Sequence, residues 1–426
     1  MTDILRGLVG LIVLVAIAIA LSQNRRAIQP RVVLAALATQ TAIGALVLFV
    51  PWGRMALGAA ASAINHVIEY GNRGMEFLFG SLVTARMYEL FGDTGFVFAF
   101  RVLPAIIYMS ALIAVLYHLG IMRWIIVGLG LVMQKLVGVS KIESFSAVTT
   151  IFLGQSEMPA ALRPYASQLR GAELFAVLTS GMAAVAGSTL AGYAGLGVRL
   201  DYLIAASFMA IPGGLLFAKI IYPTVEPSTI TVGQAHFEAS PSANVIEAAA
   251  AGAAVGLRVA VNVGAMLVAF IGLIALLNGM LSGVLGWFGY PSLNLEALMG
   301  YIFSPLAWLI GVPYEHAGLA GNLIGQKLIL NEFVGYASFA PYLKDPAEVT
   351  AAGLTVLDPK TIVIVSFALC GFSNLSSIGI LAGGFGAVAP NLRSEVARYG
   401  LRVVAAATLS NLASATIAGA FLGAGR

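Results

Sequence analysis

Cysteine is nearly absent from this sequence of 426 residues, since Cys370 is its only thiol. An intramolecular disulfide and a zinc or iron-sulfur site built on cysteines are therefore excluded. Histidine is also scarce. The four histidines share no metal-ligand spacing, and the pair Glu315-His316 lacks the second histidine of an H-E-x-x-H motif. We therefore expect no metal centre of the zinc type and no organic cofactor.

Charge is scarce too, because only 10% of the residues are charged and the net charge is +4. The basic residues lie in short connectors and not on a continuous face, so the pattern predicts no surface that binds nucleic acid. Apolar residues, in contrast, make up 59% of the chain, and 48 positions are glycine. This composition indicates a polytopic membrane protein embedded in a lipid bilayer, and not a soluble fold around one large core.

The N-terminal segment contains two apolar stretches, 8–21 and 32–50, on either side of a turn that carries Arg25 and Arg26. This pattern predicts a helical hairpin with a basic turn. The positive-inside rule places the turn in the cytoplasm and the N-terminus on the outer side. A cleaved signal peptide is the alternative interpretation, because a small-residue segment, Ala18-Ile19-Ala20, lies at the end of the first apolar stretch.

The remaining apolar stretches repeat one order of elements. Each half contains a bent stretch, typical of a re-entrant hairpin, and then an interrupted span and a further span. A polar segment at 54–95 predicts an amphipathic helix in the interface, and 223–243 is the longest expected cytoplasmic connector. We expect spans at 97–119, 174–196, 203–222, 256–285, 358–389 and 403–422, and hairpins at 124–165 and 298–336, the second broken by Pro305 and Pro313.

The predicted fold class is thus an all-α polytopic membrane protein with eight transmembrane helices and two opposed re-entrant hairpins, arranged as an inverted repeat. An arginine-rich connector at 393–402, expected inside, leaves the C-terminus on the outer side with the N-terminus. Inverted repeats place the substrate between their broken segments near the bilayer midplane. We expect the hairpin tips to meet the segments 179–189 and 369–377 there.

Two glutamates, Glu157 and Glu332, lie inside apolar, glycine-interrupted stretches. A carboxylate at membrane depth is costly unless it binds a ligand or carries a proton. The pattern therefore favours a binding or proton-carrying function for both residues. A purely structural salt bridge with Arg163 or Lys327, which are nearby in sequence, is the alternative.

Polar side chains around the two glutamates form two sets of different chemistry. The first set offers an amide, two hydroxyls and a carboxylate, which suit the mixed donors and acceptors of a heterocycle. The second offers a carboxylate, an amide and a hydroxyl for a polyol, with a phenyl ring for packing. Neither contains a cluster of Arg or Lys, so a phosphorylated substrate is not expected. The first set is Gln155, Ser156, Glu157 and Thr189, and the second is Glu332, Phe372, Asn374 and Ser377.

Three strings resemble the concentrative nucleoside transporter family: 143–157, which ends in Gly154-Gln155-Ser156-Glu157, 327–334 and 371–380. The similarity extends over nearly the whole chain. It implies a homotrimeric, elevator-type symporter of the bacterial inner membrane, with both termini periplasmic, that takes nucleosides of the uridine, adenosine and cytidine class. It also implies that the first set of side chains lies on the nucleobase side and the second on the ribose side.

An elevator has a transport domain that slides past a scaffold, and the resemblance divides the chain accordingly. It implies scaffold helices 1–3 with the interfacial helix at 1–123, and the first hairpin with transport helices 4–5 at 124–222. The connector and scaffold helix 6 follow at 223–290, and the second hairpin with transport helices 7–8 at 291–426.

The resemblance places the family's sodium site at Thr150, Leu153, Ala184 and Val185. Sodium-coupled relatives add an asparagine and a serine side chain to backbone carbonyls there, whereas Thr150 keeps one oxygen and Ala184 supplies none. A hard cation needs several well-placed oxygens, so proton coupling is favoured, with Glu157 or Glu332 as the titrating group. Because the carbonyls of Leu153 and Val185 remain available, sodium coupling stays open as the alternative.

Two other classes of function compete with symport. A membrane-embedded enzyme would need an aspartate pair, a Ser-His arrangement or metal ligands at depth, and the sequence shows none of these patterns. A passive solute channel would need no coupling ion. Accumulation of solute against its gradient distinguishes a symporter from a channel, and chemical conversion of the solute would indicate an enzyme.

Overall fold

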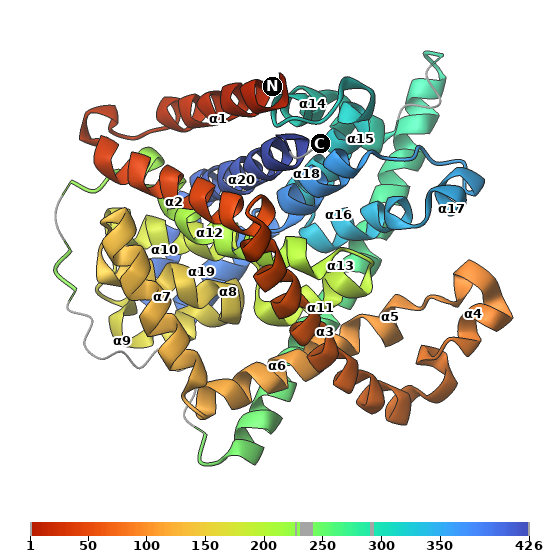
Figure 1. The fold of residues 1–426 in the computed structure, drawn as a ribbon, viewed down its shortest axis with the longest axis horizontal. Coiled ribbons are helices and arrows are strands. Elements are labelled where there is room, and N and C mark those ends of the chain that lie inside the picture. The colour runs from red at the N-terminus through yellow and green to blue at the C-terminus, as the bar shows by residue number, and fades with distance from the viewer. Residues whose placement is uncertain (1, 226–227, 231–241, 290–293, 425–426) are drawn as a thin grey trace.

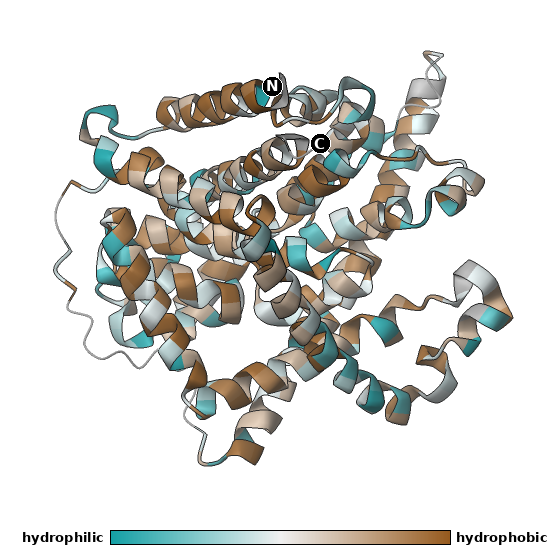
Figure 2. Ribbon diagram, in the orientation of Figure 1, coloured by the Kyte–Doolittle hydropathy of each residue, from teal (hydrophilic) through white to brown (hydrophobic). Residues whose placement is uncertain are grey.

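The computed structural model describes residues 2–225, 228–230, 242–289 and 294–424, and these ranges contain helices and connectors but no strand (Figure 1). Six of their helices are long and apolar enough to cross a membrane, or seven if one bent pair counts as a span. Apolar residues dominate these helices, as Figure 2 shows. An all-helical fold is thus confirmed, whereas the predicted number of eight spans stays a prediction.

The N-terminal hairpin is present as two helices, α1 (Thr2–Ala20) and α2 (Pro30–Leu48), joined by a turn with the short helix η1 (Arg25–Ala27). The guanidinium of Arg25 donates to the carbonyls of Ile19 and Ala20, both at 3.0 Å, and so satisfies the end of α1. Both helices pack against α12 (Leu200–Ile221) and α20 (Arg393–Ala424). The N-terminal segment therefore packs on the outside of these two helices.

The polar segment that follows forms α3 (Pro51–Phe79) and α4 (Arg86–Phe91), neither of which is apolar enough to span. The next span consists of α5 (Phe98–Arg101) and α6 (Leu103–His118), and α6 packs mainly against α13 (Val245–Gly286). The predicted span at 256–285 lies within α13, which begins earlier, at Val245. The added segment is rich in alanine, the strongest helix former.

The first half of the repeat contains the predicted hairpin, a broken helix and a helix. The region predicted as a hairpin contains α7 (Ile121–Val137) and α8 (Lys141–Ala161), which pack against each other, and α8 itself is broken at Gly154 into two arms. The side chain of Ser140 accepts from Glu143 N while the carboxylate of Glu143 accepts from Ser140 N, a capping box that starts α8. After the short α9 (Arg163–Ala166), the broken helix is α10 (Gly171–Ala183) and α11 (Gly187–Gly195), and α12 follows.

The second half repeats this order with α14 (Leu295–Leu309), α15 (Tyr314–Ile329) and α16 (Glu332–Phe339), then α18 (Pro359–Leu369), α19 (Ser376–Val388) and α20. The expected break at Pro305 is wrong, because Pro305 lies inside α14. The expected break at Pro313 is confirmed, because Pro313 directly precedes α15 and the chain bends by 116° between α14 and α15, where Gly311 has φ +114°. Only Gly311 in that turn has the left-handed backbone that favours glycine.

The arginine-rich connector at 393–402 is also a correction, since these residues belong to α20, which starts at Arg393 and not at 403. Pro390 begins a short 3₁₀ turn that ends α19, and the helix-forming residues after it continue without a break. The predicted connector at 223–243 lies partly outside the described residues. The short helices not yet given are η2 (Gly80–Val83), η3 (Gly92–Gly95), η4 (Ala340–Leu343), α17 (Pro346–Ala351) and η5 (Pro390–Leu392).

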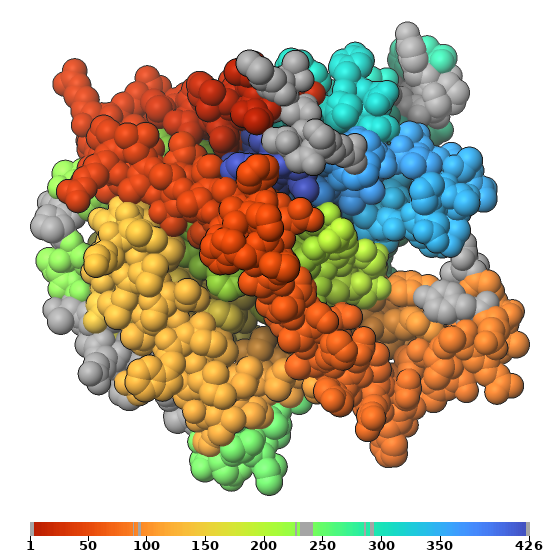
Figure 3. Space-filling model, in the orientation of Figure 1, coloured from red at the N-terminus to blue at the C-terminus, as the bar shows by residue number. Residues whose placement is uncertain are grey.

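The core lies around α10, α12 and α20, which pack on one another and are almost entirely buried. Residues of α2, α3 and α7 cover much of the face seen in Figure 3, where α20 shows only as a small blue patch. The long α13 lies at the periphery, and most of its side chains are at least partly exposed. The two broken helices thus occupy the interior, where the sequence predicts a site.

Candidate functional site

Three breaks in helices meet at one place. Within α8, Gly154 has φ +73°, a left-handed conformation that interrupts the helix. A Cβ on Gly154 would lie 2.6 Å from Ala186 Cβ and 3.5 Å from the ring of Phe372, so glycine is required for this approach. The backbone N–H of Phe372 also donates to the carbonyl of Ala184 at 3.3 Å. The first hairpin therefore touches both broken helices, as the sequence predicts.

A chain of hydrogen bonds crosses this meeting point. Gln155 donates from Nε2 to Ser377 Oγ at 2.7 Å, and the Ser377 hydroxyl donates to Asn374 Oδ1 at 3.0 Å. Asn374 in turn donates from Nδ2 to Glu332 Oε2 at 3.0 Å, and Tyr193 donates from its hydroxyl to Glu332 Oε1 at 3.2 Å. This hydrogen-bond network joins α8, α19, α16 and α11. Four residues predicted from the sequence are thus brought together.

Side-chain hydrogen bonds at two helix starts hold Glu332 and Asn374 in place. Asn331 accepts from Val334 N at 2.9 Å and caps α16, so Glu332 is the first residue of that helix. A carboxylate there is stabilised by the positive end of the helix dipole. Asn374 likewise accepts from Ser377 N at 2.9 Å at the start of α19. The helix ends therefore fix where the carboxylate and the amide point.

Tyr193 belongs to this hydrogen-bond network, but the sequence analysis did not predict it as a site residue. Its side chain is fully buried, with ring centroids 4.7 Å from Phe333 and 4.6 Å from Tyr336. A buried phenol needs a hydrogen-bond acceptor, and Glu332 Oε1 is the acceptor here. The only signal in the sequence was its spacing, because Tyr193 lies four residues after Thr189 on the same helix.

The other predicted site residues are not part of this hydrogen-bond network. Ser156 and Glu157 are the two residues that follow Gln155 in α8. Ser156 is exposed and Glu157 is partly buried. Thr189 is buried, but its hydroxyl donates to the carbonyl of Ala186 at 2.7 Å within its own turn. Phe372 is buried beside Gly154. These four residues lie beside the hydrogen-bond network but are not part of it.

Neither glutamate has the salt bridge considered from the sequence. Within the described part of the chain, no ion pair joins Glu157 to Arg163 or Glu332 to Lys327. The two acceptors of Glu332 are instead occupied by neutral donors, a phenol and an amide. A third acidic residue, Glu143, does form a buried ion pair with Lys219, which ties α8 to α12.

The four positions of the expected sodium site are all buried. Thr150 carries the only side-chain oxygen among them, and its hydroxyl donates to Ala147 O at 2.9 Å and lies 3.4 Å from Ser180 O. Ala184 ends the helix α10 in an extended conformation, and its carbonyl accepts from Phe372 N. The side chains of Leu153 and Val185 are apolar, so these two residues offer only backbone oxygens.

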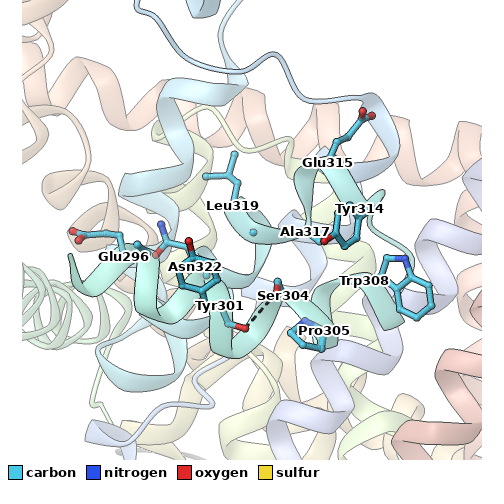
Figure 4. A pocket seen from close by; sticks show the side chains of 13 residues that line it. Glu296, Tyr301, Ser304, Pro305, Trp308, Tyr314, Glu315, Ala317, Leu319 and Asn322 are labelled. Carbon is cyan, nitrogen blue, oxygen red and sulfur yellow. Dashed lines mark hydrogen bonds between the residues drawn. The ribbon is translucent and has the colours of Figure 1, made fainter. Parts of the chain in front are cut away.

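Three cavities in the described residues lie away from the hydrogen-bonded residues. One of about 1000 Å³ opens between α14 and α15, lined by Tyr301, Trp308 and Tyr314 among others (Figure 4). A second, of about 370 Å³, contains Glu143 and Lys219. A third, of about 1070 Å³, separates α13 from α11 and η4. None of the three is lined by Gln155, Glu332 or their partners, which pack against one another.

Comparison with known families assigns the chain as a whole. The family described as "Na+ dependent nucleoside transporter C-terminus" matches residues 202–419, and its N-terminal counterpart matches 9–82. A family described as "Nucleoside recognition" matches 99–199, which includes Gln155 and Tyr193. The chain belongs to the concentrative nucleoside transporter family. It is therefore a nucleoside transporter and not an enzyme.

Relatives and solved structures of this family match over nearly the full length. The chain is 53% identical to an uncharacterized transporter of Haemophilus influenzae, over 99% of both chains, and 47% identical to the nucleoside permease NupC of Helicobacter pylori, over 98% and 97%. A structure of CNTnw in an inward-facing substrate-bound state is 52% identical, with a TM-score of 0.94 over 99% of this chain and 98% of that one. The multi-span helical fold of the family is thus shared.

Proposed function

We propose that the chain is a concentrative symporter that imports nucleosides across the bacterial inner membrane, driven by protons. The proposal rests on the buried hydrogen-bond network from Gln155 to Glu332. This network presents amide, hydroxyl and carboxylate groups from both halves of the repeat. Such groups match a nucleoside, which has a heterocyclic edge and hydroxyls but no phosphate. The relatives named as nucleoside permeases support the substrate class.

We assign the residues of the two halves to different parts of the nucleoside. Gln155 and its neighbours Ser156, Glu157 and Thr189 lie on the first hairpin and first broken helix, and we assign them to the nucleobase. Glu332, Asn374, Ser377 and Phe372 lie on the second hairpin and second broken helix, and we assign them to the ribose. The Gln155–Ser377 hydrogen bond would open to admit substrate, because each partner would then bond the nucleoside.

Proton coupling is proposed because side-chain oxygens are few at the expected ion site. Thr150 offers one hydroxyl that already bonds its own helix, and Ala184 offers none. Glu157 and Glu332 are the candidates to carry the proton, as carboxylates inside the helical core. Sodium coupling through the carbonyls of Leu153, Ala184 and Val185 is the alternative that the experiment must separate.

The experiment is uptake of labelled uridine, adenosine, cytidine and guanosine into proteoliposomes under separately imposed sodium and proton gradients. Accumulation above the external concentration, driven by a proton gradient without sodium, is the expected result. Uptake driven by sodium at fixed pH and indifferent to a proton gradient would refute proton coupling. Downhill flux alone would indicate a channel and refute symport.

Assembly and motion are proposed from the family resemblance. We expect a homotrimer with both termini periplasmic and a transport domain that slides past a scaffold. Helices that pack together are expected to move together. Helices α1 and α2 pack against α12 and α20, whereas α6 pairs with α13. The division at residues 123, 222 and 290 stays a prediction, and disulfide crosslinks between α2 and α12 test whether those two helices move together.

A further inference from the structure

A fully buried lysine lies behind the substrate-site residues. Lys327 is on α15, is 2% exposed, and donates from Nζ to the carbonyl of Ala368 at 2.9 Å and to Asn411 Oδ1 at 2.7 Å. Within the described residues no carboxylate forms an ion pair with it. A buried ammonium that no carboxylate contacts directly is costly, so a functional reason for its presence is expected.

The partner of Lys327 bridges the two broken helices. Asn411 on α20 donates from Nδ2 to the carbonyl of Ala183 at 2.7 Å and to that of Cys370 at 3.0 Å. Ala183 is the last residue of α10, and Cys370 directly follows α18. Ser373 Oγ also donates to Asn411 Oδ1 at 2.9 Å. One amide thus joins the C-terminal ends of both half-helices, and Lys327 adds a positive charge to it.

The approach is close enough to depend on glycine. A Cβ on Gly371 would lie 2.2 Å from Asn411 Oδ1 and 2.7 Å from the carbonyl of Ala183. No larger residue could leave the amide between the two helix ends. The carbonyls there carry the partial negative charge of the helix C-termini, which a cation stabilises.

The two halves of the repeat differ at this position. In the first half, Thr150 precedes the break of α8 by one turn and its hydroxyl faces Ser180 O of α10. In the second half, Lys327 precedes the end of α15 by less than one turn and its ammonium binds Ala368 O of α18. In transporters built on broken helices, half-helix C-termini are places where coupling cations bind. Here the second half carries a covalently attached cation.

We propose that Lys327 is a tethered cation and a positioning residue: its ammonium takes the place of a bound ion at the ends of α10 and α18. It thereby holds the loop from Cys370 to Asn374 that directs Asn374 toward Glu332. The loop begins at the carbonyl that Asn411 binds and ends at the amide that binds Glu332. Charge at Lys327 is therefore required for the sugar side of the site, although the ammonium touches no substrate.

The test uses charge removal and chemical rescue. Lys327→Gln keeps hydrogen-bond donors without charge, and we expect uridine uptake to fall at least tenfold through a raised KM. Lys327→Ala deletes the equivalent of propylammonium, so added propylammonium should restore the thermal unfolding midpoint and uptake, whereas 1-propanol should restore neither. Arg123→Gln, which removes an exposed charge at the start of α7, is the control and should behave as wild type.

Wild-type uptake by Lys327→Gln, or equal effects of the two additives on Lys327→Ala, would overturn the proposal. The uptake measurement rests on the proposed function, but the unfolding midpoint needs no substrate. If the wild-type protein carries no nucleoside, the proposed function fails, while selective stabilisation by propylammonium would still identify Lys327 as a tethered cation. The two failures are therefore distinguishable.

Discussion

Gln155 and Ser377, which are 222 positions apart in the sequence, are joined by a hydrogen bond of 2.7 Å between Nε2 and Oγ. Ser377→Ala leaves the amide without this acceptor in a buried place, at a cost of about 1–3 kcal/mol. We expect a lower unfolding midpoint and a raised KM for uridine. Ser376→Ala is the matched control, because the Ser376 hydroxyl donates to Asn374 and its side chain is partly exposed. Equal effects of the two substitutions would contradict the assignment.

Glu332→Gln tests the carboxylate. Both oxygens of Glu332 accept from donors, Tyr193 and Asn374, so an amide at this position must turn its NH₂ group toward one of them. We expect a folded protein with uridine uptake close to background, measured in proteoliposomes beside Glu315→Gln, whose side chain is 76% exposed. Uptake at the wild-type rate in Glu332→Gln would refute the ribose-side function.

Tyr193→Phe separates hydrogen bonding from packing at the same residue. The ring keeps its contacts with Phe333 and Tyr336, but Glu332 Oε1 loses its donor. We expect uptake to fall several-fold and KM to rise. Tyr336→Phe is the comparison, since that hydroxyl donates to the carbonyl of Ser366 at 2.8 Å. A larger loss of uptake in Tyr336→Phe than in Tyr193→Phe would count against a positioning function for Tyr193.

The sequence predicts the order of hairpins and broken helices because glycine, proline and polar residues in apolar stretches mark the interruptions. It also predicts Gln155, Glu332, Asn374 and Ser377, since amides and carboxylates at membrane depth are rare. Tyr193 was missed because an aromatic residue in an apolar helix looks like core, and its acceptor comes from another helix. The helices α13 and α20 extend beyond the predicted spans because helix propensity continues through segments that the sequence pattern assigns to connectors.

Ala184→Ser tests the coupling ion. The substitution adds a side-chain oxygen at the end of α10, beside the hydroxyl of Thr150, where the wild-type residue offers only a carbonyl. A hard cation gains one ligand there, so we expect uptake at fixed pH to become stimulated by sodium. Ala186→Ser, in the same break, is the control. Sodium stimulation of the wild-type protein equal to that of Ala184→Ser would show that the carbonyls suffice and that proton coupling is wrong.

The buried ion pair between Glu143 and Lys219 offers a test of how the first hairpin is held. Lys219→Met leaves the carboxylate buried and unpaired, which should lower the free energy of unfolding by about 3–5 kcal/mol. The double variant Glu143→Gln/Lys219→Met should recover most of this loss, because glutamine keeps the capping box with Ser140 and no charge remains buried. Lys344→Met, which breaks an exposed pair with Glu348, should cost at most about 0.5 kcal/mol. If the losses of Glu143→Gln and of Lys219→Met, each measured alone by thermal unfolding, simply added in the double variant, the pair would not fix α8 to α12.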